Sequence, residues 1–240
     1  MSAILVTGTD TGVGKTMVTC AIASELTRKD ISVGVYKPVE TGCSHEHGRL
    51  FGADARRLRA AAGGRQSEAS LAGYLFELAA APLAAARNAG GVVDPSRLEE
   101  DIRAIDAAHD ITLVEGAGGL LVPIAERFTY LDLARRLSLP VVVVVGSRLG
   151  CVNHALLTLT VLINAGAPCV GYVLNQAAPR AEDTPTAESN RDLIAEFSHV
   201  PCLGIFPHVG PARRDDYAHL AALAEEALDL TTLSYDVPTL

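Results

Sequence analysis

A lysine and a threonine follow a glycine-rich run close to the start of the chain. The run is Gly8-Thr9-Asp10-Thr11-Gly12-Val13-Gly14-Lys15-Thr16. Glycines allow the backbone to turn back so that successive N–H groups point inward, and the start of a following helix adds positive potential there. Such a loop binds phosphate, with Lys15 on the β- and γ-phosphates and the Thr16 hydroxyl on Mg²⁺. The usual motif is GxxxxGK[ST]; here Gly8 precedes Gly14 by one residue more, so the loop is a variant.

A second element supplies an acid where such a loop needs one. Thr112-Leu113-Val114-Glu115 is a hydrophobic run that ends in a carboxylate, and four small residues, Gly116-Ala117-Gly118-Gly119, follow it. In nucleotide-binding proteins of this type, a carboxylate at a strand end lies near Mg²⁺. The small residues allow the backbone to approach a ligand closely. The two elements together predict ATP and Mg²⁺ binding. The alternatives are an ordinary glycine-rich turn and an acid that only ends a strand.

Four segments, in their order and spacing, make the chain resemble the dethiobiotin synthetase family over most of its length. They are Gly8-Thr9-Asp10-Thr11 with Gly14-Lys15-Thr16, Tyr36-Lys37-Pro38-Val39 with Thr41-Gly42, Val114-Glu115-Gly116-Ala117-Gly118-Gly119, and Leu149-Gly150-Cys151-Val152-Asn153-His154. The resemblance implies that 7,8-diaminononanoate takes up CO₂ as a carbamate and that ATP converts this to a carbamic-phosphoric anhydride. The second amine then closes the ureido ring, which gives dethiobiotin, ADP and phosphate. A homodimer is also implied, with the tail of the diamine near the subunit interface.

The resemblance further implies roles for single residues. The catalytic residues would be Lys37, Lys15 and Thr11. The nucleotide would be bound by Asp10, Gly12, Val13, Gly14, Lys15, Thr16 and Asn175, the last reading adenine. The substrate would be bound by Thr41, Asn153 and Gly118, and the metal by Thr16, Asp54 and Glu115. A carbamate is a weak anionic nucleophile, so bringing it beside a triphosphate needs positive charges that are fixed in advance.

Several of these residues have simpler explanations. Lys37 at a strand end is also consistent with a surface lysine that keeps its charge in water. Asp54 and Asn153 each stand near a predicted helix start, where N-capping is a common task. Asn175 is of a type that often forms turns. Thr41 keeps the hydroxyl of the serine that the family more often has there, whereas Gly12 replaces an acid found in some relatives.

The elements that must position these residues alternate along the chain. Short apolar runs predict strands at Ala3–Val6, Ser32–Tyr36, Ile111–Glu115, Pro140–Val145, Val170–Leu174 and Cys202–Ile205. Helical spacing predicts helices at Lys15–Thr27, Asp54–Ala62, Pro95–Ala108, Tyr130–Leu137, Asn153–Asn164, Glu188–Phe197 and Asp215–Leu228. This alternation predicts an α/β fold of the P-loop NTPase type, a doubly wound and mainly parallel sheet with helices on both faces. Ligands would then bind beyond the carboxyl ends of the strands.

Composition excludes other classes of protein. The chain has 240 residues, 49% of them hydrophobic and 20% charged, which predicts a single folded domain over 1–240. A formal net charge of −8 disfavours nucleic acid and anionic membranes as partners. The five widely spaced cysteines predict neither a disulfide framework nor a zinc site, and with the lack of a signal sequence they indicate the cytoplasm.

Two related classes share the expected fold. Membrane- or DNA-partitioning ATPases have a second lysine in the phosphate loop, where this chain has Asp10, and often a basic amphipathic tail, whereas Thr231–Leu240 is polar and acidic. Glutamine-dependent amidoligases need a glutaminase half for which 240 residues leave no room. The segment Arg180–Thr186 is predicted to be an exposed loop, and no roles are assigned within 180–190.

Overall fold

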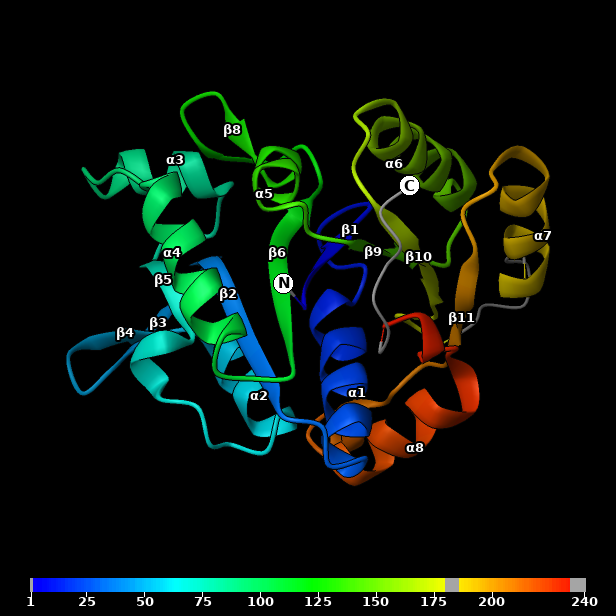
Figure 1. Cartoon of the computed structure of the whole chain (residues 1–240), viewed down its shortest axis with the longest axis horizontal. Helices are drawn as coiled ribbons and strands as arrows, with labels where there is room; N and C mark the ends of the chain where they lie inside the picture. Colours follow the sequence, from blue (N-terminus) through cyan, green and yellow to red (C-terminus); the bar gives the residue numbers. More distant parts are fainter. Residues whose placement is uncertain (1, 180–185, 234–240) are drawn as a thin grey trace.

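The computed structural model describes residues 2–179 and 186–233. Its centre is a seven-stranded sheet in the order β11-β10-β9-β1-β6-β2-β5, in which every neighbouring pair is parallel (Figure 1). The strands are β1 (Ala3–Gly8), β2 (Val33–Thr41), β5 (Ala72–Phe76), β6 (Ile111–Gly119), β9 (Val141–Gly146), β10 (Cys169–Asn175) and β11 (Cys202–Phe206). Two antiparallel hairpins lie outside the sheet, β3 (Ser44–Glu46) with β4 (Arg49–Phe51), and β7 (Pro123–Ala125) with β8 (Phe128–Thr129).

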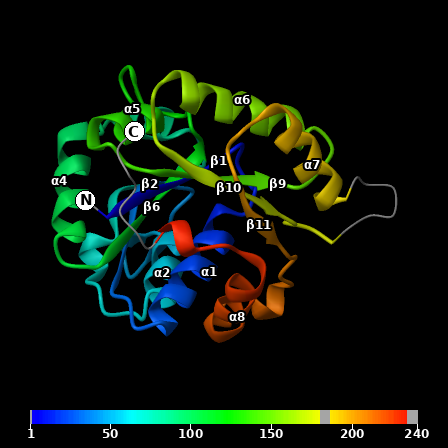
Figure 2. The same cartoon turned by 45° about the vertical axis from the view of Figure 1, so that its right-hand side comes forward.

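Helices cover both faces of the sheet. They are α1 (Lys15–Arg28), α2 (Ala53–Ala61), α3 (Pro82–Asn88), α4 (Pro95–Asp106), α5 (Tyr130–Leu137), α6 (Cys151–Asn164), α7 (Ala187–Phe197) and α8 (Tyr217–Ala227). Each face of the sheet has its own hydrophobic core. Helices α1, α2 and α8 pack on one face, and α3 to α7 pack on the other (Figure 2). All residues of β1 and β9 are buried, as expected for central strands that are covered on both sides.

The chain changes direction at the middle of the sheet. After β1 it builds β2, β5 and β6 on one side, then returns past β1 to add β9, β10 and β11 on the other. Ligands of such sheets bind where the order reverses, beyond the carboxyl ends of the strands. The loop Gly8–Thr16 leaves β1 at this position and leads into α1.

Strand β2 pairs with β6 in its first half and with β5 in its second half, and the change of partner comes directly before Pro38. Its pairing with β6 ends at Tyr36 opposite Val114, and from Lys37 onward it pairs with the edge strand β5. The N–H groups of Val35 and Lys37 point toward the β5 side, where they donate to Gln66 and Leu71. Alternation along a strand therefore turns the nitrogen of Pro38 toward the β6 side, where no ladder bond is lost. Lys37 and Glu115 stand at the point where the two strands part.

The predicted α/β class is confirmed, and all six predicted strands and seven predicted helices are present. The structure adds β5, α3 and the two hairpins, which the sequence analysis did not predict, and extends β2 to Thr41 through Pro38. Helix α6 begins at Cys151 rather than Asn153, and α8 begins at Tyr217 rather than Asp215. The loop predicted at 180–186 lies outside the described residues up to 185, as does the tail from 234. Within the described ranges, no helix is both long and apolar enough to span a membrane.

Candidate active site

A cavity of about 700 Å³ lies at the carboxyl ends of the strands. The phosphate loop, β2, α2, β6, the end of β10 and the segment after β11 all contribute to its lining. Ten of the predicted site residues line it: Thr11, Gly12, Gly14, Lys15, Thr16, Lys37, Thr41, Asp54, Gly118 and Asn175. The structure therefore brings together residues that are up to 164 positions apart in the sequence (175 − 11).

The phosphate loop folds over the ammonium of its own lysine. Lys15 is buried and its Nζ donates to the carbonyl of Asp10 at 2.9 Å. Burial lowers the pKa of Lys15 to about 8, because the nearby Glu115 only partly offsets the loss of water and Lys37 adds repulsion. Gly14, directly before it, has φ +89°, and a Cβ there would lie 2.0 Å from Nδ2 of Asn175. Only glycine suits this position.

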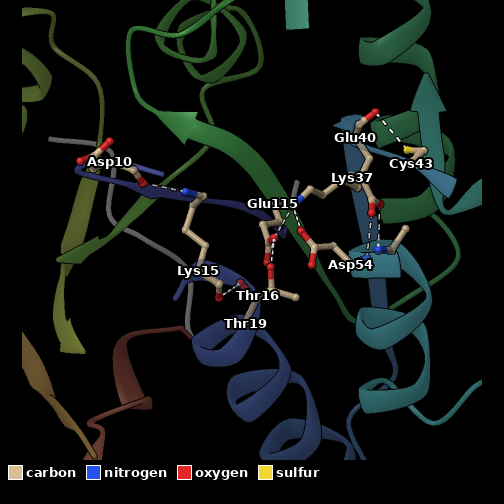
Figure 3. A network of polar contacts seen from close by, with 10 residues as sticks. Asp10, Lys15, Thr16, Thr19, Lys37, Glu40, Cys43, Asp54 and Glu115 are labelled. Atoms are coloured by element: carbon tan, nitrogen blue, oxygen red, sulfur yellow. Dashed lines mark hydrogen bonds and ion pairs between the residues drawn. The ribbon is translucent and has the colours of Figure 1, made fainter. Parts of the chain in front are cut away.

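Lys37 lies in a network of polar contacts at the floor of the cavity (Figure 3). Its Nζ donates to Oε1 of Glu115 at 2.5 Å and to Oδ2 of Asp54 at 2.9 Å. Oε1 of Glu115 also accepts from the Thr16 hydroxyl at 2.8 Å. The network thus links β2, α2, β6 and the first turn of α1.

The positive charge of Lys37 in this network is balanced by the carboxylates of Asp54 and Glu115. Lys37 is only 4% exposed, which contradicts its interpretation as a surface lysine. Burial lowers the pKa of Lys37, but the carboxylates of Glu115 and Asp54 outweigh it and hold that pKa well above its ordinary value. Burial likewise raises the pKa of Asp54, and Lys37 together with the Thr16 hydroxyl brings it below the usual range. The lysine stays protonated and the acid stays ionised at neutral pH.

The donor set fits a magnesium ion that is shared with a phosphate group. Thr16, Asp54 and Glu115 offer one hydroxyl and two carboxylates, and Oε2 of Glu115 is buried without a hydrogen-bond partner among the described residues. In the described part of the chain, no group of three or more His, Cys, Asp or Glu side chains could hold a metal. Mg²⁺ in nucleotide sites takes one or two carboxylates and completes its shell with phosphate and water. The residues present match that pattern.

Asp10 and Thr11 occupy the outer part of the phosphate loop. Oδ1 of Asp10 accepts from the backbone N–H of Thr11 at 2.7 Å, and its Oδ2 accepts from Arg148 at 2.8 Å. Thr11 is exposed, and its hydroxyl lies 3.5 Å from where a Cβ of Gly118 would be. The Thr11 hydroxyl and the Gly118 backbone therefore lie close together in the cavity lining.

Asn175 uses part of its amide within the protein. The residue is 2% exposed, and its Nδ2 donates to the carbonyl of Val13 at 2.7 Å. This contact ties the end of β10 to the phosphate loop. The adenine-reading role of Asn175 stays a prediction. The simple turn-forming explanation is insufficient, because the side chain holds the phosphate loop.

Asn153 is the predicted site residue that lies apart. It is exposed, and within the described residues the cavity lining does not include it. The N-cap explanation is wrong, because α6 begins at Cys151 and its N-cap is Gly150. Asp54 is not an N-cap either, since Gly52 holds that position in α2. Asn153 lies on the exposed surface of α6, one helical turn before the exposed side chain of Leu157.

The sequence analysis missed several residues that line the cavity. Glu40 is buried at the end of β2, and Arg57, His208 and Arg214 line the side formed by α2 and the segment after β11. Glu40 stands between Val39 and Thr41, beyond the predicted end of the strand at Tyr36, so no local pattern marked it as buried. Arg57 donates to Asp215 and to the carbonyl of Arg214, a long-range arrangement that no local pattern indicates.

Comparison with solved structures supports the fold alone. MinD of Pyrococcus horikoshii, in complex with Mg-ADP, aligns with a TM-score of 0.58 at 18% identity and covers 93% of this chain and 95% of its own. A ParA family ATPase of Chlorobium tepidum aligns with a TM-score of 0.54 at 14% identity, over 98% and 96%. MinD and the ParA family ATPase therefore share the architecture of this chain, and the fold alone does not decide the function.

Comparison with sequences distinguishes between the classes of protein that share this fold. Residues 2–214 match the family model described as an AAA domain. The ATP-dependent dethiobiotin synthetase BioD of Anaeromyxobacter dehalogenans is 43% identical over 86% of this chain and 90% of that protein. The enzyme of the same name from Pseudomonas aeruginosa is 40% identical over 88% and 92%. With these matches and the geometry of the cavity, the chain belongs to the ATP-dependent dethiobiotin synthetase BioD family.

Proposed function

We propose that the protein is a dethiobiotin synthetase that carboxylates 7,8-diaminononanoate with CO₂ and closes the ureido ring with ATP. One amine of the substrate adds to CO₂, loses a proton and becomes a carbamate. A carbamate oxygen attacks the γ-phosphorus and expels ADP, which gives the carbamic-phosphoric anhydride. The second amine attacks the carbonyl carbon, the C–O bond to phosphate breaks, and dethiobiotin and phosphate are released. Membership of the BioD family supports this reaction.

The observation that carries the proposal is the burial of two lysines at one cavity. Lys15 and Lys37 are 7% and 4% exposed, and both line it. Two anions, the carbamate and the γ-phosphate, repel each other strongly in a site of low dielectric constant. Ammonium groups that are already in place lower this repulsion without reorganisation during the reaction. In the proposal Lys15 neutralises the β- and γ-phosphates, and Lys37 stabilises the charge transferred between carbamate and phosphate.

Magnesium completes the phosphate end of the proposed site. Thr16, Asp54 and Glu115 would hold Mg²⁺, which supplies charge neutralisation at the β- and γ-phosphate oxygens when bound. The backbone N–H groups of Gly12, Val13 and Gly14 would donate to phosphate oxygens. On binding of the metal, Oε2 of Glu115 would gain a partner that it lacks among the described residues.

The remaining predicted residues would orient the organic substrate and the base. Thr11 and Thr41 offer hydroxyl donors to the carbamate oxygens, and the backbone at Gly118 approaches from the opposite side. Asn175 lines the cavity beside the phosphate loop, which supports adenine reading by its amide.

The substrate tail and the subunit arrangement belong together in this proposal. Asn153 would hold the diamine carboxylate, although it lies outside the cavity lining of the described single chain. Leu149, just before α6, is 82% exposed, and Leu157 and Ile163 of α6 are 60% and 56% exposed. Exposed apolar side chains that gather on one element commonly mark an interface. These features support a homodimer in which α6 lies near the tail of the bound diamine.

The five cysteines bear on where the enzyme works. All five are free thiols, and Cys20, Cys43 and Cys151 are buried. Free thiols are characteristic of proteins kept in a reducing compartment. We place the enzyme in the cytoplasm on this basis.

Mass spectrometry tests the reaction directly. The purified protein would be incubated with 7,8-diaminononanoate, ¹³C-bicarbonate, Mg²⁺ and ATP. The proposal predicts dethiobiotin that carries one ¹³C atom, with one ADP released per product. Release of ADP at the same rate without the diamine, and with no labelled product, would instead indicate a nucleotide hydrolase.

A further inference from the structure

Helix α2 begins without a capping side chain of its own. Its N-cap is Gly52, which has no side chain to accept the first N–H groups of the helix. Instead, Glu40 of β2 reaches across: Oε1 accepts from the N–H of Asp54 at 2.8 Å, and Oε2 accepts from the N–H of Ala55 at 3.0 Å. Glu40 is 6% exposed, so both bonds form away from bulk water. A carboxylate from a strand thus does the work of an N-cap residue.

Gly52 leaves the space that this arrangement needs. A Cβ at position 52 would lie 2.2 Å from Oε2 of Glu40 and 2.8 Å from its Cδ. A serine or aspartate, the usual N-cap residues, would therefore displace the Glu40 carboxylate. The backbone of Gly52 has φ −92° and ψ 113°, which any residue can adopt, so contact rather than backbone conformation requires glycine here.

The consequence concerns the carboxylate of Asp54. Strand β2 holds this residue at two points: Glu40 binds its backbone N–H, and Lys37 binds its Oδ2 at 2.9 Å (Figure 3). Both anchors lie on one strand, three residues apart, and Asp54 lies in the first turn of α2. The Asp54 side chain is 40% exposed, so its own burial does little to fix it. Its place at the cavity depends on how firmly the start of α2 is held.

We propose that Glu40 is a positioning residue that aligns the carboxylate of Asp54 for the metal, and that Gly52 is required to admit Glu40. The inference rests on the proposed function, in which Asp54 binds Mg²⁺ with Thr16 and Glu115. In this proposal Glu40, although it lines the cavity, is a ligand of neither the nucleotide nor the metal. It acts through the two N–H groups of α2.

Two substitutions disturb the cap in different ways. Glu40→Gln keeps the shape but turns an N–H donor toward a backbone N–H, and Gly52→Ala pushes an intact carboxylate aside. The matched controls are Asp94→Asn, which changes the carboxylate that caps α4 on the other face of the sheet, and Gly91→Ala, where a Cβ would meet only the carbonyl of Ala86 at 3.9 Å. Mn²⁺ serves as a spectroscopic probe for the metal site.

Binding of Mn²⁺ to the full-length protein with ADP would be measured by electron paramagnetic resonance, beside the thermal midpoint of each variant. We expect Glu40→Gln and Gly52→Ala to weaken Mn²⁺ binding by about tenfold, the usual loss when the support of a metal ligand is removed. They should raise the Mg²⁺ concentration for half-maximal turnover by a similar factor. Asp94→Asn and Gly91→Ala should leave both quantities within about twofold, and Asp94→Asn should also keep its thermal midpoint, because asparagine caps a helix about as well as aspartate.

The inference is overturned if both cap variants bind Mn²⁺ like the unaltered protein and differ from it only in thermal midpoint. If Glu40→Gln does not fold, Gly52→Ala alone decides between these outcomes. Should Gly52→Ala not fold either, Glu40→Asp, which keeps the charge and shortens the reach, takes its place under the same criterion. A failure of the unaltered protein to bind Mn²⁺ with ADP would contradict the proposed function rather than the role of Glu40.

Discussion

The phosphate loop and the β2–α2 region each bring a buried lysine to the cavity, but they treat its charge in opposite ways. Lys15 donates to a backbone carbonyl, and burial lowers its pKa to about 8. Lys37 is buried to a similar degree, yet two carboxylates hold its pKa above the ordinary value. The protein compensates the Lys15 ammonium only in part, whereas it compensates the Lys37 ammonium fully.

This difference indicates separate tasks for the two lysines, one in nucleotide binding and one in the chemical step. A lysine that is poorly compensated in the free protein gains most from an anionic ligand, which suits binding of the triphosphate. A lysine that is already held by Glu115 and Asp54 gains less on binding and keeps its position throughout the reaction, which suits stabilisation of a transition state. We therefore expect changes at Lys15 to affect nucleotide affinity and changes at Lys37 to affect turnover.

The largest effect on turnover is expected from removal of Lys37. Lys37→Ala should lower kcat by about 10³-fold, as loss of a group that stabilises developing charge commonly does. The affinity for ADP, measured by isothermal titration calorimetry, should change by less than about threefold. Lys29→Ala, at an exposed lysine of comparable charge, serves as the control and should keep full turnover. Near-normal kcat in the Lys37 variant would remove the central role from this residue.

The same change leaves a charge behind in the protein. Without Lys37, Glu115 loses its cationic partner while fully buried. Leaving one member of a buried ion pair typically costs about 3–5 kcal/mol of stability. Thermal unfolding of each variant is therefore needed beside the assay, so that turnover is compared only where the protein is folded.

Substitution of Glu115 tests the proposed metal site, through the Mg²⁺ requirement, separately from the role of Lys37. Glu115→Ala removes a carboxylate from Thr16 and Lys37 at once, and we expect the Mg²⁺ concentration for half-maximal activity to rise by about tenfold or more. Glu226→Ala, at an exposed acid of α8, controls for the loss of a negative charge. An unchanged magnesium titration would reject a shared metal site for Thr16 and Glu115.

The pKa of Lys15 predicts a pH dependence of nucleotide binding. Phosphate stabilises the protonated lysine, so its pKa in the complex lies above the value of about 8 in the free protein. Affinity is then fully present below pH 8 and falls as the pH rises through that value, by about tenfold between pH 7 and 9. Titrations with ADP should show this loss in the unaltered protein. Lys15→Arg, whose guanidinium stays charged, should show a flat profile, and a matching slope in both proteins would contradict the assignment.

The smallest effect is expected at the exposed ion pair of the phosphate loop. Arg148 and Asp10 keep 59% and 49% of their side chains exposed, in contrast to the buried pair of Lys37 and Glu115. Exposed pairs typically contribute about 0–1 kcal/mol. Arg148→Ala should therefore lower the unfolding free energy by less than about 1 kcal/mol in denaturant titrations. A loss as large as that of Lys37→Ala would show that exposure does not separate the two regions.

Local pattern was sufficient for the central elements but not for the edge of the sheet. The continuous apolar runs of β1 and β9 predict buried parallel strands, and both are fully buried. β5 (Ala72–Phe76) was missed because it is short, half-buried and interrupted by Gly73. The extension of β2 through Pro38 was missed because it depends on the partner change from β6 to β5, which exists only in three dimensions.

The contacts of the candidate site were likewise predictable only in part. Motif spacing was sufficient to predict that Lys15, Thr16 and Glu115 would meet, and the structure joins Thr16 to Glu115. Sequence did not reveal that Lys37 would be paired with Asp54, or that Glu40 would hold the helix that carries Asp54. Those contacts arise from strand and helix packing, for which no local pattern exists.

Oxygen transfer tests the central claim most directly, that two ammonium groups bring a carbamate to the γ-phosphate. The enzyme would be given C¹⁸O₂, the diamine, Mg²⁺ and unlabelled ATP in a short reaction, and the released phosphate would be examined by mass spectrometry. The account predicts phosphate that carries one ¹⁸O atom, because the carbamate oxygen attacks phosphorus and leaves with it. Phosphate without label, formed at the same rate as ADP, would mean that water is the nucleophile and would contradict the account.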